Sequence, residues 1–226
     1  MRHRTLAVAL VAGLALAGAA GSSARTGFTA RVDNPWFPLK AGTRYEYVGV
    51  KDGLPSRDVV VVARKVAIID GKPCAVVQDR LYLRGRLRER TTDWYSQDSR
   101  GNVWYLGEDT AELDRKGRVT STEGTWKAGV DGAVAGVYMP AHPRVGMSGR
   151  QEYYRGHAED RFRVVGVFRS VTSGRDENVV LTQETTRLEP GTVDHKMYAR
   201  GIGTVLEQTE RGGDERNELV SLTTTP

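Results

Sequence analysis

The sequence predicts an all-β, mostly antiparallel protein: a long-stranded curved sheet or partly closed barrel with a long irregular covering loop. From residue 43 onward, runs rich in β-branched and aromatic residues alternate with turn signals. Helical periodicity is almost absent from the chain. The turn glycines at positions 53, 71, 85, 101 and 117 lie 14 to 18 residues apart. Sandwich domains show turn signals about every 8 to 12 residues, so this wider spacing predicts longer strands and favours a curved sheet or barrel.

The first 24 residues have the pattern of a secretory signal peptide. A basic tip with Arg2 and Arg4 precedes an apolar run over 6–20 and the small residues of 21–24, which suit cleavage after Ala24. The apolar run is short of the about 20 residues that span a bilayer. We therefore expect a secreted or extracytoplasmic protein that is soluble after cleavage, with no transmembrane anchor in the mature chain.

Composition indicates a globular protein and excludes several classes. The 226 residues are 39% hydrophobic and 27% charged, with 33 basic and 28 acidic side chains. Loss of Arg2 and Arg4 with the signal peptide leaves 31 basic and 28 acidic groups, and no run of lysine and arginine predicts a nucleic-acid partner. Cys74 is the single cysteine, so an internal disulfide is excluded, and we expect it to be a small buried residue.

The elements follow in order along the mature chain. Residues 25–42 are expected to form a docked arm, because two prolines and two aromatic residues in 34–39 favour an extended, anchored segment. Residues 43–226 are expected to form a single β-rich domain. Glycines and prolines make 124–148 the long irregular loop, which could cover a sheet mouth. Further strands are expected at 149–171, 178–188, 193–200, 204–211 and 215–223.

Two hairpins allow a prediction of register. With turns centred on Arg84-Gly85 and Arg100-Gly101, the opposed pairs are Asp79 with Arg90, Arg80 with Glu89, Gln97 with Trp104, Tyr95 with Leu106, and Asp93 with Glu108. Because side chains alternate along a strand, one shared face then carries Val76, Gln78, Tyr82, Leu87, Thr91, Asp93, Tyr95, Gln97, Trp104, Leu106 and Glu108. Such a mixture of aromatic, amide and acidic groups is typical of a cavity for an amphipathic ligand, or of a core edge that grades into solvent.

The candidate ligand-binding residues come from this face and from the polar, aromatic segment 151–160. They are Asp93, Tyr95, Gln97, Trp104, Glu108, Glu152, Tyr154 and His157. Opposed carboxyls at Asp93 and Glu108 would lie close enough to share a proton, a cation or an arginine, so salt bridging, ligand hydrogen bonding and acid–base chemistry all remain open. No residue is assigned as catalytic.

No metal or cofactor is expected. The mature histidines His142, His157 and His195 form no paired ligand spacing, and 98–102 lacks the acidic ladder of a calcium loop. Nucleotide-binding glycine motifs and the serine-hydrolase elbow are also missing from the sequence.

Several motifs resemble a group of exported bacterial proteins with no assigned activity, some of them lipoproteins. The resemblance covers most of the mature chain and rests on the segments 34–39, 93–95, 101–105, 139–141 and 151–154. This chain departs from the lipoprotein members because no acceptor cysteine follows the signal peptide. A looser likeness, in architecture alone, is to half-barrel lipoprotein-carrier proteins, and it implies at most lipid binding.

Three functions remain open from the sequence. The first is a binding protein for a small amphipathic or carbohydrate-like ligand. The second is a hydrolase or isomerase that uses Asp93 with Glu108, or Glu152 with His157 and Glu159. The third is a structural module that contacts a cell-envelope component through the loop 124–148 and holds no small ligand.

Overall fold

The chain folds into strands and turns. The computed structural model describes residues 27–172 and 175–225, and these residues form no helix. The predicted signal peptide at 1–24 lies outside them. The strands of the first half are β1 (Phe28–Thr29), β2 (Thr43–Lys51), β3 (Leu54–Ile69), β4 (Lys72–Leu83), β5 (Arg86–Asp98), β6 (Val103–Leu113), β7 (Val119–Ser121) and β8 (Trp126–Lys127). Those of the second half are β9 (Val134–Met139), β10 (Ser148–Arg150), β11 (Glu152–Tyr153), β12 (Arg161–Thr172), β13 (Arg175–Thr185), β14 (Val193–Ala199), β15 (Gly203–Arg211) and β16 (Arg216–Thr224).

Two-residue turns connect the long strands β2 to β5. The pairs Lys51 with Leu54, Ile69 with Lys72, and Leu83 with Arg86 close three hairpins. Each turn consists of an aspartate or arginine followed by glycine, and both residues have positive φ. This backbone matches the right-handed twist of the flanking strands. The sequence therefore determines the positions of these hairpins locally.

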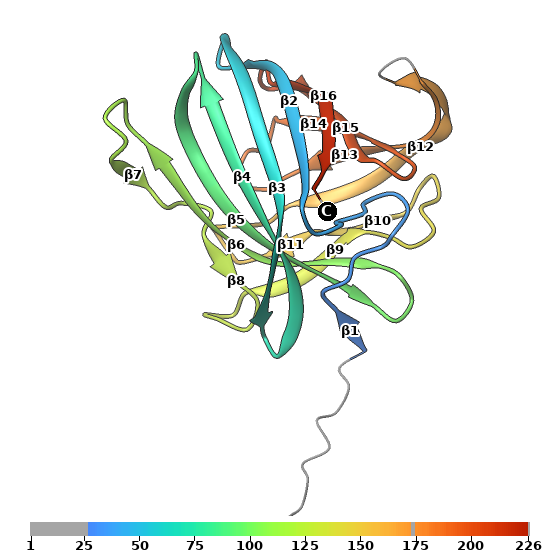
Figure 1. Cartoon of the computed structure of the whole chain (residues 1–226). Helices are drawn as coiled ribbons and strands as arrows, with labels where there is room; N and C mark the ends of the chain where they lie inside the picture. Colours follow the sequence, from blue (N-terminus) through green and yellow to red (C-terminus); the bar gives the residue numbers. More distant parts are fainter. Residues whose placement is uncertain (1–26, 173–174, 226) are drawn as a thin grey trace, which may run out of the picture.

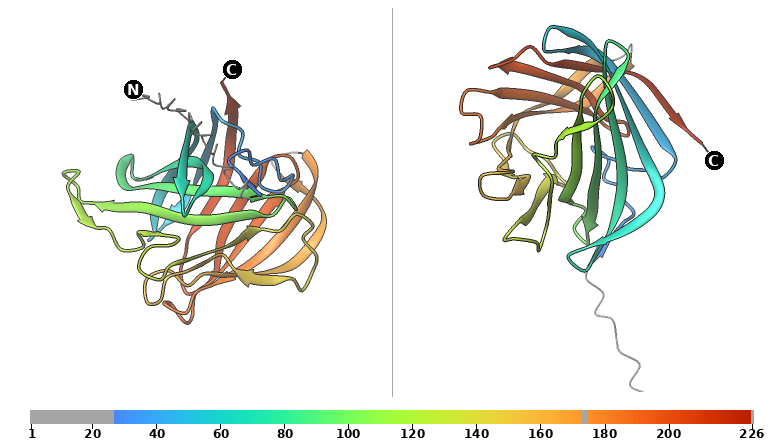
Figure 2. Two further views of the ribbon diagram at one scale, coloured as in Figure 1. Left: turned by 90° about the horizontal axis from the view of Figure 1, so that it is seen from below. Right: turned by 90° about the vertical axis from the view of Figure 1, so that its left-hand side faces the viewer.

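The strands form one antiparallel sheet that curls into a nearly closed barrel, which confirms the predicted fold class. Among the described residues, the hydrogen-bonded order is β10-β12-β13-β14-β15-β16-β2-β3-β4-β5-β6-β9-β11. Figure 1 shows β2 to β6 on one side and β12 to β16 on the other, and Figure 2 shows the curl from two further directions. The stretch 124–148, expected as an irregular loop, also contributes the short strands β8 and β9, both paired with β6.

One seam of the barrel is not sealed by a continuous ladder. The two ends of the strand order, β10 and β11, are consecutive in the chain and flank Gln151. At this seam β9 approaches so closely that a β-carbon on Gly136 would lie 2.3 Å from the carbonyl oxygen of Arg150. The Gln151 amide donates to the Asp160 carbonyl oxygen over 2.9 Å. The segment around Gln151 thus fills the seam with its backbone.

Residues 28–42 pack against one end of the barrel. Strand β1 pairs with the end of β5, and Asn34 is almost fully buried. The Asn34 side chain accepts from the Trp36 amide over 2.8 Å and donates to the carbonyl oxygens of Gly101 and Pro140. These bonds fix the segment 34–39 across the barrel end, where the ring of Phe37 contacts Tyr95, Tyr138 and Tyr198.

The apolar core is continuous with this end of the barrel. Buried residues from β2 to β6 and from β12 to β16 form one cluster with the 32–39 segment. Its fully buried members include Val62, Leu106, Met139, Val180 and Tyr198. The core occupies part of the barrel and leaves the remainder for the cavity described next.

Candidate ligand cavity

A cavity of about 300 Å³ lies inside the barrel. Phe37, Pro38 and Leu39 line it from the arm, and strands from both sides of the barrel supply the other residues. Its acidic lining residues are Asp58, Asp79, Asp93, Glu108, Glu152, Asp160, Glu184 and Glu207. Lys196 is the one lysine, arginine or histidine among the lining residues that the structure describes. The interior of this barrel is therefore strongly acidic.

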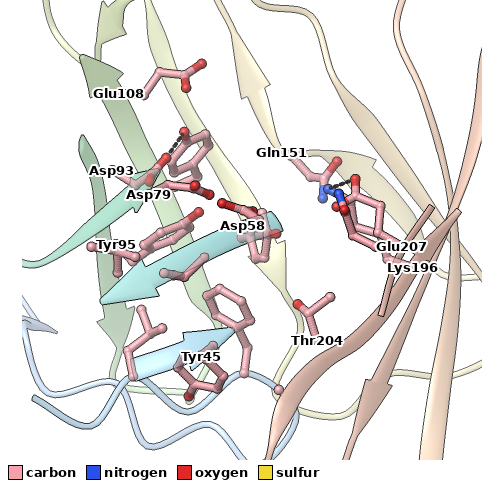
Figure 3. A pocket seen from close by; sticks show the side chains of 18 of the residues that line it. Tyr45, Asp58, Asp79, Asp93, Tyr95, Glu108, Gln151, Lys196, Thr204 and Glu207 are labelled. Atoms are coloured by element: carbon pink, nitrogen blue, oxygen red, sulfur yellow. Dashed lines mark hydrogen bonds and ion pairs between the residues drawn. The ribbon is translucent and has the colours of Figure 1, made fainter. Parts of the chain in front are cut away.

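Four of these acids form a row across neighbouring strands, here called the acid row: Asp58 on β3, Asp79 on β4, Asp93 on β5 and Glu108 on β6. Register places Asp79 opposite Val60, two residues from Asp58, and places Val77 opposite Asp93. Asp93 and Glu108 are direct partners. Each acid therefore has another as its direct or diagonal cross-strand neighbour, within the range where side chains interact. Figure 3 shows the row on one side of the cavity.

Three members of the acid row, Asp79, Asp93 and Glu108, have raised pKa values and hold protons more tightly than ordinary carboxyls do. Burial, the charge of Asp58 and a hydrogen bond with Asp58 raise the pKa of Asp79 well above its usual value. Burial raises the pKa of Asp93 to about 7, although the Tyr105 hydroxyl, which donates to Asp93 Oδ1 over 2.7 Å, favours the ionised form. Burial and the charge of Asp93 raise the pKa of Glu108 to about 9. Without a partner cation, Glu108 keeps its proton at neutral pH.

The opposite side of the cavity contains an ion-paired lysine. The Lys196 ammonium lies 3.1 Å from Glu184 Oε2 and 3.1 Å from Glu207 Oε1. Burial acts to lower the pKa of Lys196, but Glu184 and Glu207 outweigh it and raise this pKa well above the usual value. Glu184 also accepts from the Thr182 hydroxyl over 3.0 Å and the Tyr198 hydroxyl over 3.3 Å. Both glutamates on this side therefore have a cationic partner within the protein.

Six aromatic side chains also line the cavity. They are Phe37, Tyr45, Tyr47, Tyr95, Tyr105 and Tyr138. The hydroxyls of Tyr45 and Tyr47 donate to the carbonyl oxygens of Pro38 and Thr204, over 2.9 and 3.1 Å. Tyr95 and Tyr105 stack with ring centroids 4.8 Å apart. Because their hydroxyls have protein partners, Tyr45 and Tyr47 contribute mainly their ring surfaces to the cavity.

Half of the candidate residues predicted from sequence meet at this cavity. Asp93, Tyr95, Glu108 and Glu152 all line it. Burial and the charge of Asp160 raise the pKa of Glu152 to about 8. Carboxyls from β5, β6 and β11 therefore share one enclosure, as acid–base chemistry or hydrogen bonding to a ligand would require.

The other four candidates lie elsewhere and have protein partners. Gln97 Oε1 accepts from the Asp33 and Asn34 amides, which ties it to the arm. The Trp104 indole donates to Asp98 Oδ2 over 2.9 Å. Tyr154 stacks on His157, whose Nδ1 lies 3.1 Å from Glu123 Oε1 on the exposed side of the seam. His157 is thus not among the lining residues with Glu152.

Register shifts account for the differences from the predicted pairing. A bulge between Leu81 and Tyr82 moves Asp79 opposite Thr91 and Arg80 opposite Arg90, so the predicted pairs with Arg90 and Glu89 are wrong. The pairing of Asp93 with Glu108 is confirmed. The loop enclosed by the last pair of β5 and β6 has an odd number of residues, which places Tyr105, rather than Leu106, opposite Tyr95, and Val103, rather than Trp104, opposite Gln97. A second bulge, between Trp94 and Tyr95, then restores the predicted register at Asp93.

These shifts change which side chains face the cavity, because a slip of one residue turns a strand's other face inward. Val77 and Asp79 line the cavity where Val76 and Gln78 were predicted, and Tyr105 takes the place of Trp104 and Leu106. The sequence carried one signal of the second bulge. Gly107 interrupts a strand, and glycine inside a strand marks a bulge or a close backbone approach.

Other lining residues had no local signature in the sequence. Asp58, Glu184, Lys196 and Glu207 lie on β3, β13, β14 and β15, among residues that include other polar side chains such as Arg57 and His195, which do not line the cavity. Closure of the barrel brings Glu184, Lys196 and Glu207 opposite β5 and β6.

The arrangement does not resemble a metal centre. In residues 27–172 and 175–225, no three histidine, cysteine, aspartate or glutamate side chains are close enough to hold a metal ion. The described residues also include no helix long and apolar enough to cross a membrane.

Comparison with known proteins extends the description of the fold. Neither a protein-family model nor a curated protein matches the sequence. Among solved structures, the chain is similar to a protein of Bacteroides fragilis, named as exported and of YmcC-like fold, with 13% identity and a TM-score of 0.48; the match covers 84% of this chain and 99% of that one.

It is also similar to a protein of Parabacteroides distasonis named as a lipoprotein, with 9% identity, a TM-score of 0.45 and the same coverage. At these identities the likeness concerns the fold alone. Both names belong to the class of exported proteins and lipoproteins that the sequence motifs resemble.

Proposed function

We propose that the chain is an extracytoplasmic binding protein that holds a small amphipathic or carbohydrate-like ligand in its barrel cavity. In this proposal residues 1–24 are removed on export, residues 25–42 act as a docked arm, and residues 43–226 form one soluble domain. The observation that carries the proposal is the cavity of about 300 Å³ with a mixed lining of rings and carboxyls. Ligand pockets begin at about this size and combine apolar walls with a few convergent polar groups.

The composition of the lining favours a ligand over a core defect. An empty cavity in a protein is usually apolar, because isolated buried carboxyls are costly without partners. Here Asp93, Glu108 and Glu152 line the cavity, and their pKa values are raised. Apolar residues of similar volume at these positions would make the fold more stable. A ligand that contacts these groups gives a reason for their presence.

The test is a ligand screen of the protein purified after export, against panels of sugars, lipids and small amines, by thermal shift and native mass spectrometry. If the proposal holds, at least one class of compound should form one-to-one adducts with the protein and raise its Tm. Thr204→Phe, which fills part of the cavity, should abolish the adducts, whereas Thr120→Phe on the exposed strand β7 should not. Absence of any adduct across the panels would support the structural module without a small ligand.

A second candidate, a carboxylate-dependent hydrolase or isomerase, is favoured by one observation. Asp93 and Glu108 are direct cross-strand partners that both line the cavity, and their pKa values are raised to about 7 and about 9. Acid–base catalysis needs two carboxyls whose protonation differs near neutral pH. Assays with aryl glycosides and aryl esters test it, since Glu108→Gln should remove any turnover and full activity in that variant would exclude this mechanism.

A further inference from the structure

Among the described residues that line the cavity, no lysine, arginine or histidine lies beside the acid row. Its members Asp58, Asp79, Asp93 and Glu108 lie on the wall opposite Lys196, which is already paired with Glu184 and Glu207. Asp58 Oδ1 is buried and accepts no hydrogen bond from an amide, a hydroxyl side chain or a cationic side chain of the described residues. Buried polar atoms almost always have a partner, and the partner that the protein offers Asp58 is the carboxyl of Asp79. The carboxyl of Asp79 lies beside it (Figure 3).

The cavity already shows how it holds an ammonium group. Lys196 Nζ lies 3.1 Å from an oxygen of each of two carboxylates, and its surroundings include the hydroxyls of Tyr138 and Tyr198. Asp58 and Asp79 offer a similar pair of carboxyls on the opposite wall, with Tyr47 directly across the strand pair from Asp58. The acid row thus repeats the chemistry around Lys196 with the ammonium absent.

The geometry favours an organic cation over a metal ion. No three acidic, histidine or cysteine side chains in the described parts of the chain cluster tightly enough for a metal. The acid row is spread across four strands, and the cavity has a volume of about ten water molecules in the liquid. Aromatic rings beside the acids favour a cation with an apolar body, because a ring face attracts a positive charge and also covers apolar surface.

Resting on the proposed function, we infer that the ligand is an organic cation whose ammonium or guanidinium group binds at Asp58 and Asp79 and whose apolar body lies against the tyrosines and Phe37. The raised pKa of Asp79 agrees with this placement, since its proton stands where the cation is expected. Binding then exchanges a carboxyl proton for the charged group of the ligand. A neutral ligand of the same shape gains no ion pair, and an anionic one meets repulsion from the row.

The test uses three probes that share one skeleton: 2-phenylethylamine, 2-phenylethanol and phenylacetate. Isothermal titration calorimetry of the protein purified after export should show the amine binding at least about tenfold more tightly than the alcohol, equivalent to about 1.4 kcal/mol. Phenylacetate should show no binding. Titrations in buffers of different ionisation enthalpy should show that amine binding releases protons.

A charge-removing variant assigns the effect to the acid row. The double substitution Asp58→Asn and Asp79→Asn should weaken amine binding at least about tenfold and bring it to the level of the alcohol. Asp109 follows Glu108 on β6 and has an exposed side chain. Asp109→Asn is therefore the matched control and should bind the amine as the wild type does. If the double variant does not fold, the wild type still tests the inference, because amine binding without proton release would overturn it.

The outcomes separate this inference from the proposed function. Binding of sugars or lipids without preference for the amine would overturn the organic cation and leave the binding protein intact. Equal binding of the alcohol and the amine would have the same meaning. Failure of every probe and every panel compound to bind would overturn both.

Discussion

The partly buried carboxyl of Glu108 should make the protein less stable as the pH rises. The folded state holds its pKa at about 9, whereas in the unfolded chain it returns to its ordinary value of 4.5. The folded state therefore binds the proton more tightly than the unfolded state does. The stability associated with this proton is fully present below pH 4.5 and is lost as the pH rises toward 9. Glu108→Gln removes the titration, because the amide cannot ionise.

The magnitude follows from the two pKa values. Between pH 4.5 and pH 9 the free energy of unfolding falls by about 1.4 kcal/mol per pH unit on account of this group. At pH 7 the loss reaches about 3 kcal/mol. Glu108→Gln should therefore be about 3 kcal/mol more stable than the wild type at pH 7 and nearly equal to it at pH 4. Among the described residues, the Glu108 side chain has no hydrogen bond that the variant would lose.

Urea unfolding followed by tryptophan fluorescence at pH 4, 7 and 9 measures these differences. Asp109→Asn is the matched control, since it removes an exposed carboxylate from the next residue of the same strand. Its stability should follow that of the wild type at every pH. The reasoning is refuted if Glu108→Gln is no more stable than the wild type at pH 7, or if the difference is the same at pH 4 and pH 7.

Three further predictions concern single residues. Lys196→Met should lower the free energy of unfolding at pH 7 by about 3 kcal/mol in urea titrations, because it leaves Glu184 and Glu207 without their cation. A loss of equal size at pH 4 would contradict this cause. Gly107→Ala should lower the free energy of unfolding by about 2 kcal/mol in the same assay, because φ at Gly107 is 139° and a β-carbon would lie 2.3 Å from the Trp126 carbonyl oxygen. Gly191→Ala is the control and should be nearly neutral, because a β-carbon there meets open space. Burial raises the pKa of the Cys74 thiol to about 11, so iodoacetamide should label it only in denaturant, and rapid labelling of the native protein would show an open structure.

Much of the fold could be predicted because its determinants are local. The turns after Lys51, Ile69 and Leu83 each need positive φ at two successive residues, and aspartate or arginine followed by glycine signals this need in the sequence. Their wide spacing gives the strand length, and strand length favours a curved sheet over a sandwich. The fold class followed from these features without knowledge of any distant contact.

The candidate site could be predicted only in part because bulges depend on tertiary contacts. The pairing of Asp93 with Glu108 was predicted correctly because two displacements cancel there. The odd-length loop beyond the last β5–β6 pair shifts the register by one residue, and the bulge between Trp94 and Tyr95 shifts it back. The bulge near Leu81 has no glycine to mark it, so Asp79 was assigned to the outer face. The bulge near Gly107 exists because strand β8 approaches β6 closely there.

The remaining acids were missed because barrel closure depends on contacts between distant segments. Asp58 and Glu207 come from strands that are about 150 residues apart in the sequence. From the sequence alone, a single acid in a strand could face either the cavity or the solvent, because side chains alternate between the two faces. Only the register of every intervening strand decides which face such a residue occupies.

The most direct test of the account is a crystal structure of the exported protein grown with 2-phenylethylamine. If the cavity binds an organic cation, electron density for the amine should appear inside the barrel. Its nitrogen should lie within hydrogen-bonding distance of the Asp58 and Asp79 carboxyls, and its ring should lie against the tyrosines. A cavity that contains only water at saturating amine, or an amine bound outside the barrel, would contradict the account.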